Sequence, residues 1–180
     1  MKRRITIAAL AASALAAAPG AWAQVGTVFK EKELTEAAII EALAPEDPVK
    51  LRSIQVRPAP GTQPVKTPAA SLLITFETNS AELTPSSRSA LDVVARALAS
   101  ERLREFSFAV EGHADPRGGH ELNMRLSQAR AETVVDYLVR QHGVGRERLN
   151  PIGKGELELA NTTVPTAPEN RRVTIKTKVE

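Results

Sequence analysis

The chain has 180 residues, with 24 Lys and Arg against 21 Asp and Glu, and 42% of its residues are hydrophobic. This length suits one domain with an extension. The chain contains no Cys, which excludes disulfides and predicts that no lipid is attached to a cysteine behind a leader.

The first 23 residues have the layout of a secretory signal peptide. A basic start at residues 2–4 precedes an Ala-rich apolar run over residues 5–18, and Ala21-Trp22-Ala23 forms a small-x-small cleavage site. A retained membrane anchor is the weaker alternative, because the run is short and only weakly hydrophobic. Three basic residues and no acidic ones fall in this segment, so the remainder carries 21 of each and has no formal net charge. The mature chain therefore gives no electrostatic indication of nucleic-acid binding.

Residues 24–56 are predicted to form an N-terminal extension. Its first part, residues 24–32, carries no clear signal. Thr35 is a good N-cap, Glu36 complements the helix dipole, and Pro45 ends the pattern, which predicts a short helix ending near Leu43. A strand is expected over residues 51–57. Four prolines and a glycine over residues 57–70 then indicate a semi-stiff linker.

The remainder, residues 71–180, is predicted to be one α/β domain. Strands are expected at residues 72–76, 106–110, 150–153 and 172–179. Thr84 and Pro85 start a helix that buries Leu91, Val94, Ala97 and Leu98, and a longer helix runs over residues 121–142. The expected buried residues of the long helix are Leu122, Leu126, Ala129, Val134 and Leu138. The order βαβαββ predicts an α/β sandwich, in which one mixed sheet carries two helices.

A carboxylate and a guanidinium lie around the turn into the long helix. Asp115 follows the second strand of this domain, a common place for ligands in α/β folds, and Arg130 lies on the helix that follows. Such a pair suits a zwitterionic amino acid, because the carboxylate binds the ammonium and the guanidinium fork binds the carboxyl group. From spacing alone, a structural salt bridge is the more ordinary explanation.

Four sequence blocks carry a resemblance to a known family. They are residues 76–83 (FETNSAEL), 112–115 (GHAD), 123–131 (NMRLSQARA) and 170–173 (NRRV). In this order and spacing they resemble the OmpA-like C-terminal domain, a periplasmic module that binds peptidoglycan. Two positions depart from the family's usual pattern: Ala114 replaces a Thr or Ser, and Arg117 stands where many relatives have a small polar residue.

The resemblance implies roles for seven residues. Asp115 and Arg130 would bind meso-diaminopimelate, whose free end in Gram-negative peptidoglycan is such a zwitterion. Asn79 and Asn123 would supply polar contacts to the stem peptide. The remaining three are Leu126, whose backbone would lie near the ligand, and Arg171 and Arg172, one of which would face it.

The expected function is non-catalytic peptidoglycan binding, with no metal or cofactor, in the periplasm of a Gram-negative bacterium near the outer membrane. It would link an envelope component to the cell wall. One alternative is an adaptor whose residues 24–56 dock a periplasmic protein assembly. A second is a metal-dependent wall hydrolase, with His113, Asp115 and His120 as ligands, although their spacing fits no standard zinc motif.

Overall fold

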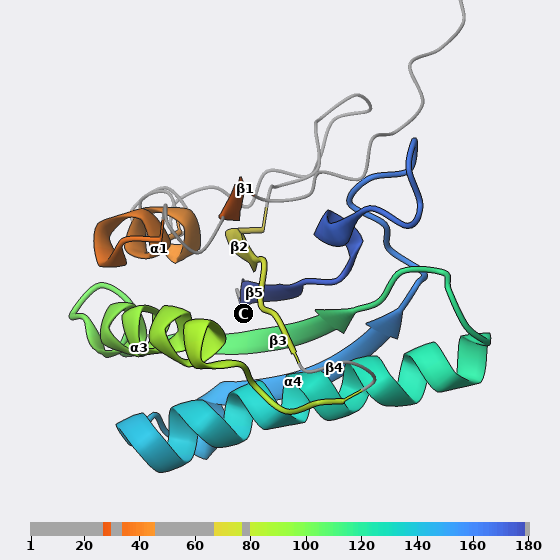
Figure 1. Ribbon diagram of the computed structural model, residues 1–180. Helices are drawn as coiled ribbons and strands as arrows, with labels where there is room; N and C mark the ends of the chain where they lie inside the picture. Colours follow the sequence, from red (N-terminus) through yellow and green to blue (C-terminus); the bar gives the residue numbers. More distant parts are fainter. Residues whose placement is uncertain (1–26, 30–33, 46–66, 77–79, 179–180) are drawn as a thin grey trace, which may run out of the picture.

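The computed structural model describes residues 27–29, 34–45, 67–76 and 80–178 (Figure 1). The predicted signal peptide (1–23), the strand expected at 51–57, most of the linker and Asn79 lie outside the described residues. The helices and strands are β1 (Thr27–Phe29), α1 (Glu36–Leu43), β2 (Ala69–Leu72), α3 (Pro85–Ala99), β3 (Ser107–His113), α4 (His120–His142), β4 (Leu149–Gly155) and β5 (Val173–Lys178), with short 3₁₀ turns η2 (Arg146–Arg148) and η3 (Pro168–Asn170).

One mixed sheet with the strand order β1-β2-β5-β3-β4 forms the centre of the fold. β5 is antiparallel to both β2 and β3, whereas β3 and β4 are parallel. From β2 onward the chain therefore has the predicted order βαβαββ, and the α/β sandwich is confirmed. The first strand of this unit is displaced, however, because it covers residues 69–72 instead of 72–76.

The sheet contains one strand more than predicted, and one helix more than predicted packs on the domain. β1 pairs in parallel with β2 and adds a fifth strand that no local signal indicated. α1 begins after the Thr35 cap and ends at Leu43, as predicted, and it then packs on the domain itself. Ile39 and Leu43 are fully buried in the common core, and the Leu43 carbonyl accepts a 2.6 Å hydrogen bond from Thr177 Oγ1 on β5. The apolar face of α1 is therefore covered by the rest of this chain. This does not favour the alternative in which residues 24–56 dock a periplasmic protein assembly.

The two predicted domain helices are held by local caps and by the core. Thr84 Oγ1 accepts the backbone N–H of Ser87 and Pro85 occupies the first turn of α3, as expected. α4 ends at Gly143, which adopts the left-handed conformation (φ 66°) typical of a helix C-terminus. The fully or almost fully buried side chains between the helices and the sheet include Leu72, Leu91, Leu98, Phe108, Val134, Leu138 and Ile175.

The buried face of α4 differs from the prediction near its start. Leu122 is 54% exposed and Leu126 and Ala129 are only half-buried, while Asn123 and Ser127 are buried. Ser127 is buried because its hydroxyl accepts the backbone N–H of Gly155 on β4 at 2.9 Å. α4 also lies directly on the backbone of β3, since a Cβ on Gly112 would collide with the Ser127 carbonyl. This close approach fixes the position of Arg130, one turn further along α4.

Candidate functional site

Asp115 lies at the end of β3, in the turn that leads into α4. The residue is 5% exposed. Its carboxylate accepts the backbone N–H of Arg117 at 3.1 Å, which closes a local Asx-type turn before Gly118 (φ 111°). The buried amide of Asn123 donates to the Asp115 carbonyl at 3.2 Å. Asn123 therefore supports the turn from within α4, and this bond uses one of the two N–H groups of its amide.

Two arginines hold the Asp115 carboxylate. Arg117 donates from Nη2 to Oδ2 at 2.7 Å and from Nε to Oδ1 at 3.1 Å, and Arg171 donates from Nη1 to Oδ2 at 2.8 Å. The Arg117 hydrogen bonds lower the pKa of Asp115 from 3.8 to about 2, and Arg171 adds to this shift while burial opposes it. The carboxylate is therefore ionised throughout the physiological pH range.

Arg130 is held in a different way, by a hydrogen bond from its Nε and by contact of its guanidinium with an aromatic ring. Its Nε donates to the Ser80 carbonyl at 3.1 Å, and its guanidinium lies 4.8 Å from the centre of the Phe76 ring. Burial lowers the pKa of Arg130, and the charge of Arg171 adds to this, whereas Asp115 acts in the opposite direction. Arg130 is thus within electrostatic reach of both residues. Among the described residues its two terminal NH₂ groups have no hydrogen-bond partner, so they remain able to bind a carboxylate.

The neighbouring residues Arg171 and Arg172 point to different places. Arg171 reaches Asp115, as described above, whereas Arg172 is buried and donates to the Glu158 carbonyl at 3.2 Å. Of the two, Arg171 is therefore the one at the candidate site. It is positioned by Asn170, a fully buried residue whose side chain bonds to the backbone of Asn161 and donates to the Pro165 carbonyl at 2.7 Å.

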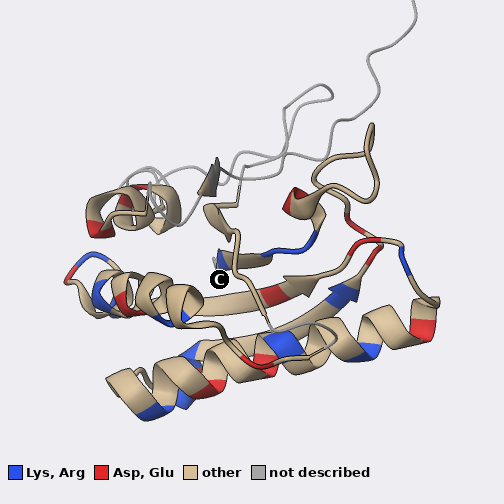
Figure 2. Ribbon diagram, in the orientation of Figure 1, with Lys and Arg blue, Asp and Glu red and all other residues tan. Residues whose placement is uncertain are grey.

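The structure brings together some predicted residues and adds others. Asp115, Asn123, Arg130 and Arg171 converge, Leu126 lies part-buried on the same helix, and Arg172 lies elsewhere. Sequence reasoning did not find the partners that hold these side chains, which are Phe76, Ser80, Arg117 and Asn170. Signals were present for all four, since Phe76 and Ser80 lie in the first family block, Asn170 opens the last one, and Arg117 is two residues from Asp115. Charged residues of both signs occur along α4, so this helix does not present a single-sign surface (Figure 2).

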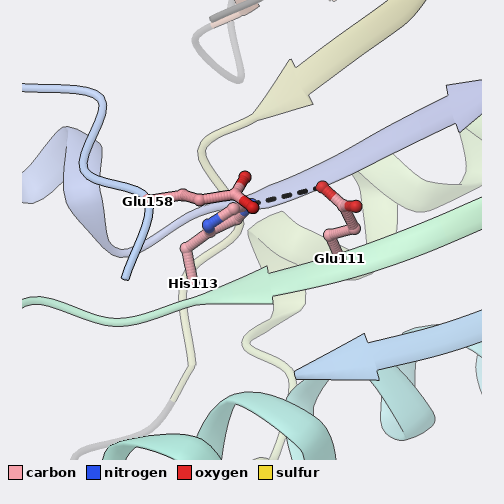
Figure 3. A group of neighbouring side chains, drawn as sticks. All are labelled: Glu111, His113 and Glu158. Atoms are coloured by element: carbon pink, nitrogen blue, oxygen red, sulfur yellow. Dashed lines mark ion pairs between the residues drawn. The ribbon is translucent and has the colours of Figure 1, made fainter. Parts of the chain in front are cut away.

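The three residues of the metal-site alternative do not form a cluster. Asp115 is bound by arginines, and His120 Nδ1 lies 2.7 Å from Glu156 Oε1. His113 points to another acidic group, with its Nε2 3.9 Å from Glu111 Oε2 (Figure 3). The predicted ligand set is therefore not brought together.

Glu111, His113 and Glu158 are the one group in the described part of the chain whose ligand atoms lie close enough to suggest a metal site (Figure 3). Their carboxylates are already paired: Lys176 Nζ lies 2.6 Å from Glu111 and Lys154 Nζ 2.7 Å from Glu158. Burial and the nearby charge of Arg172 lower the pKa of His113 to about 3, so the ring is neutral at pH 7. Three cationic side chains against two carboxylates leave an excess of positive charge. This group therefore fits an internal charge network better than a cation site.

No helix in the described ranges is both long and apolar enough to cross a membrane.

Comparison with known proteins places this arrangement in a family. The chain is 38% identical over 104 residues to the "Probable lipoprotein YiaD" of Escherichia coli, covering 57% of this chain and 46% of the relative. It is 38% identical over 103 residues to the "Peptidoglycan-associated lipoprotein" of Pseudomonas aeruginosa, covering 56% and 59%. The chain thus spans about half the length of these curated relatives.

Solved structures agree on the fold. The peptidoglycan-associated lipoprotein from Burkholderia pseudomallei matches with a TM-score of 0.51 and 24% identity, over 60% of this chain and 89% of that one. The OmpA-like domain of FopA1 from Francisella tularensis matches with a TM-score of 0.52 and 23% identity, over 61% and 73%. The model of the OmpA family matches residues 75–173, more than half of the sequence. The chain therefore belongs to the OmpA family.

Proposed function

We propose that this protein binds peptidoglycan without catalysis, through the free end of meso-diaminopimelate, in the periplasm of a Gram-negative bacterium. It would thereby link an envelope component or the outer membrane to the cell wall. The observation that carries the proposal is the state of Arg130. Its guanidinium is held by Nε and by the Phe76 ring, yet its terminal NH₂ groups have no partner among the described residues.

The two charges of the ligand would be divided between two side chains. Arg130 binds the ligand carboxylate with both terminal nitrogens, a geometry that suits its planar fork. Asp115, ionised and almost fully buried, binds the ammonium group. A lysine-type stem has the ammonium but lacks the second carboxylate, so Arg130 would have no partner in it.

The expected affinity is modest. Hydrogen bonds to charged groups contribute roughly 1.5–3 kcal/mol each before ordering costs. A few of them correspond to a dissociation constant in the range of about micromolar to millimolar. Because the cell wall repeats the ligand many times, the protein would still be retained near it.

The comparisons support the coarser part of this proposal. Two relatives are named for association with peptidoglycan or the outer membrane: the Pseudomonas aeruginosa lipoprotein and outer membrane protein A of Serratia odorifera. Catalysis is not favoured, since His113, Asp115 and His120 each bind or face a different partner.

Co-sedimentation with purified sacculi tests the proposal. Asp115→Asn keeps the shape of the side chain and removes its charge. Arg130→Gln removes the charge and the terminal NH₂ groups from the other half of the site. Both variants should remain in the supernatant, while Arg125→Gln should pellet like the wild type. Arg125 is a matched control because it lies on the same helix, its side chain is 69% exposed, and its one ion-pair partner among the described residues is Glu121. Native circular dichroism together with wild-type pelleting of either site variant would refute the assignment.

A further inference from the structure

The candidate site carries more positive charge than a zwitterion needs. Among the described residues, three guanidinium groups, from Arg117, Arg130 and Arg171, lie around the single carboxylate of Asp115. The excess is two charges, or one if Glu156 is included, which is bound to His120 at the start of α4. The free end of diaminopimelate has no net charge. A ligand that matches this site therefore brings at least one further carboxylate.

Of the three guanidinium groups, that of Arg117 is best placed to bind a further carboxylate of the ligand. Its side chain is 63% exposed, against 39% for Arg171 and the half-buried state of Arg130. Its neighbours in the turn are exposed as well, so the Arg117 guanidinium can turn from the buried Asp115 carboxylate toward another anion without disturbing packed side chains. Arg171 is different, because it leaves the chain beside the buried, four-times hydrogen-bonded Asn170.

Binding of an ammonium group requires this exchange. Asp115 accepts three side-chain N–H contacts from Arg117 and one from Arg171, in addition to the Arg117 backbone N–H. These bonds use the acceptor positions of both carboxylate oxygens. An incoming ammonium must therefore displace a donor, and the exposed guanidinium of Arg117 is released most easily.

We propose that Arg117 is a specificity-determining residue that exchanges its carboxylate partner when the ligand binds. The ligand ammonium takes the place of Arg117 on Asp115, and the released guanidinium binds a second carboxylate of the stem peptide. In a diaminopimelate stem the adjacent candidate is the α-carboxylate of the glutamate that precedes diaminopimelate. Arg117 thus distinguishes stems in which this group is a free acid from stems in which it is a carboxamide. This inference rests on the proposed function.

Isothermal titration calorimetry with two soluble tripeptides tests the exchange. Both contain meso-diaminopimelate, and they differ only in the glutamate α-group, which is an acid in one and a carboxamide in the other. The wild type should bind the acid about three- to fivefold more tightly, as expected for one exposed ion pair. Arg117→Gln should bind both peptides equally. Its affinity for the carboxamide should equal or exceed that of the wild type, because Asp115 no longer has to release Arg117.

Arg125→Gln is the matched control and should keep the wild-type preference. A wild type that binds both peptides equally would overturn the role of Arg117 and leave the diaminopimelate site intact. The same holds if Arg117→Gln keeps the wild-type preference, or if it loses both affinities in equal proportion, which would indicate a purely structural role. A wild type that binds neither peptide contradicts the proposed function itself, and this inference with it.

Discussion

Replacement of Gly112 by alanine tests how α4 is held on the sheet. A Cβ at this position would collide with the backbone carbonyl of Ser127, and neither atom belongs to a side chain that can rotate away. Overpacking in a well-packed core typically costs about 1–3 kcal/mol. Because relief here requires α4 to move from β3, we expect Gly112→Ala to lower the free energy of unfolding by about 3 kcal/mol. Such a movement would also displace Arg130 from Asp115 and weaken ligand binding.

Gly119 provides the matched control. It lies seven residues away at the start of α4, has an ordinary φ of −80°, and a Cβ there would meet nothing within 4 Å. Gly119→Ala should change the stability by no more than about 0.5 kcal/mol, because the lost chain entropy of the unfolded state offsets a slightly poorer cap. Urea unfolding followed by circular dichroism measures both variants. Equal midpoints for Gly112→Ala and Gly119→Ala would refute the close-packing argument.

Three further results are expected. His113 is neutral in the folded state down to about pH 3, whereas in the unfolded chain it is protonated below about pH 6.5. The free energy of unfolding should therefore fall by about 2 kcal/mol between pH 8 and pH 5, and His113→Asn should remove that decrease. A pH profile that this substitution leaves unchanged would contradict the burial of the ring. In Asn170→Asp the carboxylate cannot donate to the carbonyls of Asn161 and Pro165, so urea unfolding should show a free energy of unfolding lower by about 2 kcal/mol. A wild-type midpoint would show that these bonds contribute little to stability. Ile39→Asp places a charge in the core and should destabilise the whole domain by at least about 3 kcal/mol; a stable, fully folded variant would mean that α1 is detachable.

Elements with local signals could be predicted from the sequence, and those held by distant partners could not. α1 and α3 start at Thr35 and Thr84, whose side chains cap the first turn, so their start sites were predicted correctly. β1 has three residues and exists through its pairing with β2, some 40 residues away, for which periodicity gives no indication. α4 was predicted as a helix, but its buried face was wrong at Leu122, because buried Asn123 and Ser127 satisfy backbone groups of other elements.

The candidate site shows the same division. The sequence blocks selected Asp115 and Arg130, and the structure places them within electrostatic reach of one another. Arg171 and Arg172 could not be separated by sequence alone, because they are adjacent in the segment between η3 and β5 and differ only in the direction of their side chains. The occupation of Asp115 by Arg117 depends on side-chain geometry within a turn, which a motif does not encode.

Sedimentation of the wild-type protein with two kinds of sacculi tests whether Asp115 and Arg130 recognise meso-diaminopimelate. One preparation contains meso-diaminopimelate in its stems, and the other contains lysine at the same position. The protein should pellet with the first and remain in solution with the second, since only the first offers Arg130 a carboxylate. Equal pelleting with both walls would contradict recognition of diaminopimelate by Asp115 and Arg130.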